Sequence, residues 1–180
     1  NGILSSLLDG TESVDEIIYT DRYVRNPLVV NLLAGVLLKL QNRQNSNVKR
    51  IKILGREYSK DDRRSGFLAW HDWSDHTARD SGIQQTLSFC GLQAEIISQP
   101  HVPHYRQMQL RLASGNTIVI QLDQGFSFWG NDRENRNLQG LRVDFSSERL
   151  GEEIMRRIEC NVVSPPNDRT QVFVYTTEQE

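Results

Sequence analysis

The residues "VDEIIYTDRYVRNPLVVNLLAGVLLKLQNRQ", at positions 14–44, predict a strand followed by a helix. The first half of this stretch is rich in β-branched and aromatic residues, which is typical of a strand that ends at a polar group. Pro27 suits the first turn of a helix, because its missing N–H needs no partner there. The apolar residues after it occupy nearly every side of about four turns, so we expect this helix to be largely covered.

A second strand and a second helix follow in the same rhythm. "VKRIKILG", Val48 to Gly55, alternates basic and apolar residues and stops at glycine. Strand, helix and strand together form a βαβ unit with parallel strands and a right-handed crossover. Cap-type residues from Ser74 begin a helix that ends near Gly91, and "AEIISQP" then gives a third strand. This alternation is the signature of an α/β layer.

The next segment changes the rhythm. "QMQLRLAS" and "NTIVIQL" are two strand patterns, and Ser114-Gly115-Asn116 between them is turn chemistry. We therefore predict an antiparallel hairpin, which makes the β-sheet mixed and the fold class α/β with helices flanking it. Further along, the residues from Ser146 to Cys160 predict a helix, and "TQVFVYT" predicts a short strand.

At 180 residues the chain can bury one core and is short for two. We predict an N-terminal lead-in over residues 1–13, one α/β domain over 14–162, and a C-terminal strand and tail over 163–180. The first residue is Asn1 rather than methionine, so we expect a piece of a longer protein.

Composition narrows the class of partner. Charged residues make up 24% of the chain and the net charge is −2, so we expect a soluble protein with at most a local nucleic-acid-binding patch. The two cysteines, Cys90 and Cys160, give neither a disulfide framework nor a paired-cysteine metal site, which favours a cytoplasmic setting. No apolar run reaches the roughly 18 to 20 residues that cross a bilayer.

The segment Gly55 to Asp75 has no steady period and predicts a long loop. Within it "HDWSDH", His71 to His76, superficially resembles a metal site. Because metal ligands need a rigid frame, we predict instead a solvated loop that leads into a helix N-cap, with no metal or other cofactor. Trp70 and Trp73 either fold this loop onto the core, which we favour, or stack on a base or lie at a membrane surface.

Two segments carry an anion-binding pattern. The loop after the first strand lies at the carboxyl edge of the expected sheet, next to the positive N-terminus of the Pro27 helix. His104 and Arg106 are two residues apart, so on a strand both point to one face. A histidine can attack phosphorus while a fixed cation steadies the phosphate oxygens. The candidate ligand-binding residues are Asp21, Tyr23, Arg25, Asn31, His104 and Arg106.

Three stretches, "YTDRYVRNPLVVNLLAGVLLKL", "HYR" and "SGNTIVIQLDQGFSFW", carry a resemblance. They resemble, in matching order, the phospholipase D-like domain at the C-terminus of microtubule-interacting-and-transport proteins and related bacterial domains. The resemblance covers Val14 to Gly130 and implies a single phospholipase D-like repeat. It also implies binding of acidic phosphate groups and dimerisation.

The chain departs from the pattern of active phospholipase D enzymes, which carry His-x-Lys followed four residues later by Asp. Arg106 stands in the lysine place, Leu110 or Arg111 stands in the Asp place, and only one copy of the motif is present. Tyr105 also replaces the aspartate in the binding family's His-Asp-Arg.

We therefore predict a non-catalytic domain that binds nucleic acid or acidic lipid through phosphates and mediates assembly within a larger protein, as a homodimer or with a partner domain. The first alternative is a dimeric phosphodiesterase or nuclease in which His104 is the catalytic nucleophile. The second is a structural docking module of a bacterial helicase or defence protein.

Overall fold

The computed structural model describes residues 12–42, 46–63, 72–122, 130–131, 163–164 and 172–177. The strands of its main sheet are β1 (Val14–Thr20), β2 (Arg50–Arg56), β3 (Glu95–Gln99), β4 (Arg106–Leu112), β5 (Thr117–Leu122) and β8 (Val172–Thr177). The helices are α2 (Pro27–Gln41) and α3 (His76–Phe89), with a short 3-10 turn, η1 (Lys60–Arg63). Two further short strands, β6 (Gly130–Asn131) and β7 (Val163–Ser164), pair with each other.

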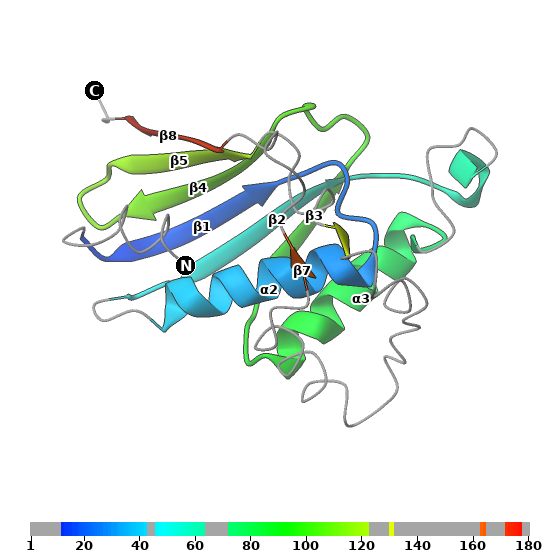
Figure 1. Cartoon of the computed structure of the whole chain (residues 1–180), viewed down its shortest axis with the longest axis horizontal. Helices are drawn as coiled ribbons and strands as arrows, with labels where there is room; N and C mark the ends of the chain where they lie inside the picture. Colours follow the sequence, from blue (N-terminus) through cyan, green and yellow to red (C-terminus); the bar gives the residue numbers. More distant parts are fainter. Residues whose placement is uncertain are drawn as a thin grey trace.

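The main sheet is mixed, as the sequence predicts. Its strand order is β3-β2-β1-β4-β5-β8, with β1, β2 and β3 parallel and β4, β5 and β8 joined by antiparallel pairs (Figure 1). The predicted hairpin is confirmed, and Gly115 at its turn has a φ of 95°, a conformation that favours glycine. β4 pairs antiparallel with β1, so the hairpin joins the βαβ layer at the centre of the sheet.

The predicted helix after Pro27 is confirmed as α2. The Asn26 side chain accepts a hydrogen bond of 3.1 Å from the Val29 N–H, which caps the helix where Pro27 begins it. Leu33 and Leu37 are fully buried, in one core cluster with residues of β1, β2, β4 and α3. Both helices therefore pack on the same face of the sheet (Figure 1).

The predicted loop from Gly55 to Asp75 is described only in part. It contains η1, and its residues 64–71, with Trp70 and His71, lie outside the described residues. Trp73 packs against the core, and a Cβ added at Gly82 would lie 2.5 Å from its ring. The prediction that the loop folds back onto the core is confirmed for this tryptophan.

The predicted strand near the C-terminus is confirmed as β8, which pairs with β5. The helix predicted from Ser146 to Cys160 lies outside the described residues. Within the described ranges, neither helix is long and apolar enough to cross a membrane.

Glu16 joins three strands from the sheet face opposite the helices. Its carboxylate is almost fully buried and lies 2.7 Å from Arg111 Nη1 on β4, 3.2 Å from Lys52 Nζ and 3.3 Å from Arg50 Nε on β2. Burial raises the pKa of Glu16, but the hydrogen bond from Lys52 and the surrounding positive charges outweigh it, so this pKa lies below its ordinary value.

The buried position of Leu33 gives a direct test of the core. Leu33→Ala should lower the free energy of unfolding by about 2 to 5 kcal/mol, because it leaves a cavity between α2 and the sheet. Leu32→Ala removes the same atoms from a partly exposed position of this helix and should cost less. Chemical denaturation measures both, and equal losses would show that Leu33 is not at the core.

Glu16 predicts part of the acid sensitivity of the fold. Because its pKa is lowered on folding, its stabilising contribution is present above the ordinary value of 4.5 and is lost as the pH falls through the lowered pKa. Between about pH 6 and pH 3 the melting temperature of Glu16→Gln should therefore fall less than that of the wild type. Glu95→Gln removes an exposed carboxyl on β3 and is the control. Parallel curves for wild type and Glu16→Gln would contradict this role.

Candidate functional site

The candidate site lies where the parallel strands end. β1 ends at Thr20, which pairs with Gln107 near the start of the antiparallel strand β4. Residues that follow β1 and residues that enter β4 therefore meet at one edge of the sheet. Asp21 and Arg106 are the first such pair, with Arg106 Nε 3.6 Å from Asp21 Oδ1.

Asp21 is the buried acid of this edge. Its carboxylate is fully buried, accepts a hydrogen bond of 2.9 Å from Tyr19 Oη, and accepts one of 2.7 Å from the Tyr23 N–H. Burial raises the pKa of Asp21, and the two hydrogen bonds and the charges of Arg106 and Arg25 oppose that rise. These contacts fix the turn after β1 and draw Arg106 towards it.

Three arginine guanidinium groups surround the ring of Tyr23. The distances from their central carbons to the ring centroid are 4.6 Å for Arg106, 5.0 Å for Arg25 and 5.3 Å for Arg22. Such cation–π contacts orient the guanidinium groups and offset part of their mutual repulsion. We call this group, together with the neighbouring His104, the Tyr23 cation cluster. It consists of Arg22, Tyr23, Arg25, His104 and Arg106.

His104 joins the cluster through Arg22, whose Nη1 lies 2.5 Å from His104 Nε2 and 3.2 Å from Nδ1. Arginine has no acceptor, so the imidazole nitrogen must accept this bond. His104 lies in a bend before β4, so the expectation that it shares a strand face with Arg106 is wrong. Pro103 has no backbone N–H to donate to a neighbouring strand. It is therefore the sequence signal that β4 begins after this residue.

Arg25 is held by a segment that sequence reasoning did not assign to the site. Arg25 Nε lies 3.3 Å from Asp72 Oδ2, and Asn26 Nδ2 donates to Asp72 Oδ1 at 3.1 Å. The Trp73 N–H donates to the Arg25 carbonyl at 2.8 Å, so the end of the long loop is fixed against the start of α2. Asp72 is buried, and its charge balances that of Arg25.

In the described part of "HDWSDH", the side chains of Asp75 and His76 contact backbone groups of the protein. Asp75 caps α3 by accepting from the Ala78 N–H at 2.9 Å, as the predicted N-cap requires, and this bond lowers the pKa of Asp75. His76 Nδ1 lies 2.7 Å from the Tyr58 carbonyl oxygen. Among the residues that the structure describes, no group of three His, Cys, Asp or Glu side chains could hold a metal ion.

Asn31 is the one predicted ligand-binding residue that the structure does not join to the cluster. It lies inside α2, is nine-tenths buried, and its Oδ1 has no hydrogen-bond partner within the described ranges. Asp21, Tyr23, Arg25, His104 and Arg106 do come together, as the sequence predicts.

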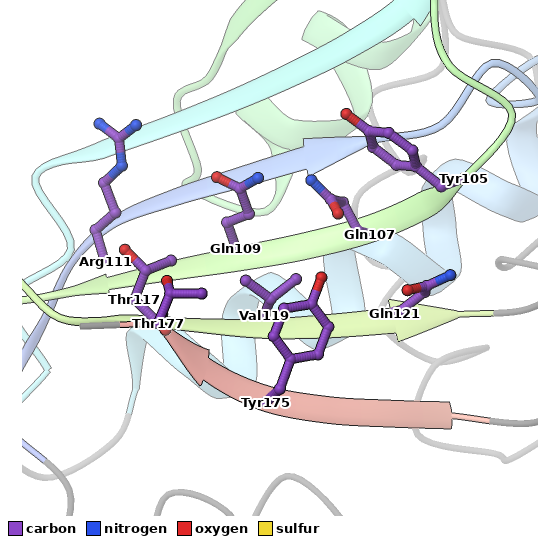
Figure 2. A pocket seen from close by; sticks show the side chains of 9 residues that line it. All are labelled: Tyr105, Gln107, Gln109, Arg111, Thr117, Val119, Gln121, Tyr175 and Thr177. Carbon is purple, nitrogen blue, oxygen red and sulfur yellow. Dashed lines mark hydrogen bonds between the residues drawn. The ribbon is translucent and has the colours of Figure 1, made fainter. Parts of the chain in front are cut away.

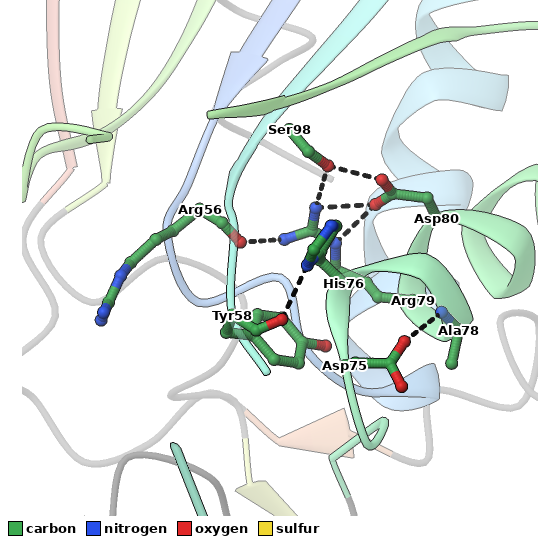
Figure 3. Close-up of polar contacts among 8 residues, drawn as sticks. All are labelled: Arg56, Tyr58, Asp75, His76, Ala78, Arg79, Asp80 and Ser98. Carbon is green, nitrogen blue, oxygen red and sulfur yellow. Dashed lines mark hydrogen bonds and ion pairs between the residues drawn. The ribbon is translucent and has the colours of Figure 1, made fainter. Parts of the chain in front are cut away.

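A second buried cation fixes the neighbouring part of the same edge (Figure 3). Arg79 of α3 is fully buried, donates from Nη1 to the Arg56 carbonyl at 2.6 Å and from Nη2 to Ser98 Oγ at 2.6 Å. Its Nη2 also lies 2.7 Å from Asp80 Oδ1. Arg79 thus ties the first turn of α3 to the ends of β2 and β3. Sequence reasoning missed it, although an isolated glycine in a strand, Gly55, is a signal of close approach.

Gly55 leaves the space that the Arg79 guanidinium occupies. A Cβ at Gly55 would lie 2.7 Å from Arg79 Nη1, so Gly55→Ala should destabilise the fold by about 1 to 3 kcal/mol through overpacking. In an Arg79→Ala background the same change should cost much less, because the clashing group is absent. Denaturation of the four variants of this cycle measures the coupling. Additive effects would contradict the assigned contact.

Together the fold and the site define a mixed α/β domain with an arginine-rich carboxyl edge. Residues 2–176 match the family described as the C-terminal domain of the DEAD/DEAH box helicase YjiV. The chain belongs to this family. The alternative that places the chain in a helicase protein is confirmed at the level of this family, while a structural docking role and a defence role stay predictions. The match gives no support to a specific relation with microtubule-interacting-and-transport proteins.

No curated protein matches the chain. Among solved structures, the chain is similar to yeast tyrosyl-DNA phosphodiesterase and to two histidine mutants of it, with 14–15% identity and TM-scores of 0.28–0.29. These matches cover 85–86% of this chain but only 36–37% of the phosphodiesterase chains.

Proposed function

We propose that this domain binds the phosphates of nucleic acid at the Tyr23 cation cluster, as a binding module of a helicase, and does not cleave them. The observation that carries the proposal is the gathering of three guanidinium groups within 5.3 Å of one tyrosine ring. Arginine forks match the geometry of phosphate oxygens. Acidic lipids carry the same phosphates, but membership of a helicase family favours nucleic acid.

The electrostatics of the cluster favour an anion. Arg25 and Arg106 have side chains that are only 16% and 15% exposed, so solvent screens their charges less than at an open surface. Asp21 and Asp72 offset part of the mutual repulsion of these guanidinium groups, and a phosphate placed among the three arginines offsets more of it. The positive end of α2 begins just after Arg25 and adds to the same field.

The contacts of His104 argue against catalysis. A histidine nucleophile needs a nitrogen lone pair directed at phosphorus, and Arg22 donates to that ring at 2.5 Å. The place where active enzymes of the resembled class carry an aspartate holds Leu110, which is fully buried in the core, or Arg111, which is a cation. A dimeric phosphodiesterase, with His104 supplied by two copies, is the alternative to this binding function. The expected homodimer stays a prediction.

Arg106→Ala should weaken binding of a single-stranded oligonucleotide by about 1 to 3 kcal/mol, because it removes a charge-assisted contact from the cluster. His104→Ala should have a smaller effect. Lys49→Ala removes an exposed cation next to the start of β2, at the opposite edge of the sheet, and is the matched control. Fluorescence anisotropy at one fixed salt concentration measures all three variants.

Two outcomes would overturn the proposal. Equal weakening by Arg106→Ala and Lys49→Ala would show that binding follows total charge rather than this cluster. Sustained, metal-independent cleavage of a phosphodiester by the purified protein, lost in His104→Ala, would favour the enzyme alternative, because a nucleophile acts on the barrier more than on ground-state binding.

A further inference from the structure

The sheet face opposite the helices is hollowed over β4, β5 and β8 (Figure 2). The hollow has a volume of about 580 Å³, and we call it the open-face groove. Its lining includes Tyr105, Gln107, Gln109, Arg111, Gln121 and Tyr175. Neither the Tyr23 cation cluster nor the Arg79 contacts include these residues.

Strand alternation explains the polar lining of this face. Met108 and Leu110 of β4 point into the core, so Gln107, Gln109 and Arg111 point to the other side. Figure 2 shows this row of β4 side chains beside the rows from β5 and β8. Glutamine side chains offer both donors and acceptors, which suits a ligand with varied polar edges.

Aromatic rings are exposed along the same region. Tyr105 is 44% exposed and Tyr175 46%, and both line the groove. Phe173 is 52% exposed and lies two residues before Tyr175 on β8, so its side chain shares that face. Among the described residues, Phe89 on α3 is the remaining exposed large hydrophobic side chain. Aromatic rings exposed on a sheet are suited to stacking with planar groups.

The charge of this face selects the kind of ligand. Three cations, Arg50, Lys52 and Arg111, contact the single carboxylate of Glu16, which leaves an excess of positive charge there. The Arg50 and Arg111 side chains are 68% and 50% exposed. A second copy facing this surface would oppose like charges, which is unfavourable, whereas an anionic chain is attracted.

We propose that the open-face groove binds the bases of single-stranded nucleic acid. Bases stack on Tyr105, Tyr175 and Phe173, the glutamines contact base edges, and Arg111 contacts the backbone. In a nucleic-acid duplex the faces of the bases are stacked inside the helix, so single-stranded nucleic acid is the form that exposes them for stacking. This surface is a second site beyond the Tyr23 cation cluster. Tyr105 lies between His104 and Arg106 in the sequence, so one nucleic-acid strand can contact both the open-face groove and the Tyr23 cation cluster.

The test uses the full chain and two fluorescent probes. One is an oligodeoxythymidylate, and the other is an abasic deoxyribose-phosphate strand of the same length, which keeps the phosphates and lacks the bases. Tyr175→Ala and Tyr105→Ala should each weaken oligodeoxythymidylate binding about 5- to 100-fold and leave binding of the abasic strand unchanged. Phe89→Ala, a similarly exposed aromatic on α3, should bind both probes like the wild type.

Tyr105 precedes β4, so its variant tests the inference even where a change within β8 disturbs folding. Wild-type affinity for oligodeoxythymidylate in folded Tyr105→Ala would overturn the inference, as would equal weakening for the abasic strand. Preferential duplex binding, or a dimer that buries Tyr175, would also overturn it. A different result would contradict the proposed function alone. In that case Arg106→Ala would bind the abasic strand like the wild type, while Tyr105→Ala and Tyr175→Ala would still weaken oligodeoxythymidylate binding.

Discussion

The arrangement of the carboxyl edge depends on the buried carboxylate of Asp21. A buried carboxylate needs hydrogen bonds and positive charge around it, and here the Tyr19 hydroxyl, the Tyr23 N–H and Arg106 supply them. Because these partners come from β1, from the turn after it and from β4, one group fixes three segments. The position of Tyr23 follows, and the arginines of the cluster gather around its ring.

Local signals in the sequence predict much of the fold. Pro27 with the preceding Asn26 marks the start of α2, and the turn around Gly115 marks the hairpin that makes the sheet mixed. These signals act within a few residues, so no tertiary contact is needed to read them. The sequence also places Asp21, Tyr23 and Arg25 correctly, because the residues after a parallel strand must lie at the carboxyl edge of its sheet.

The partners of those residues were not predictable in the same way. Arg22 meets His104 across 82 residues and Arg25 meets Asp72 across 47, and no periodicity encodes such pairs. The sequence pattern around Asp72 predicts a solvated loop, whereas burial against Arg25 decides the role of this carboxylate. The open-face groove has no signal in the sequence for a related reason, since its polar rows become one surface only when β4, β5 and β8 are paired.

Arginine side-chain NMR can show directly whether the three guanidinium groups around Tyr23 contact phosphate. Nε–Hε resonances, assigned by single Arg→Lys substitutions, would be followed during titration with the abasic deoxyribose-phosphate strand. If phosphate binds at the cluster, the resonances of Arg22, Arg25 and Arg106 should shift together with one saturation curve, while that of the fully buried Arg79 should not move. Saturable binding that leaves those three resonances unchanged and shifts those of other arginines would contradict phosphate binding at the cluster.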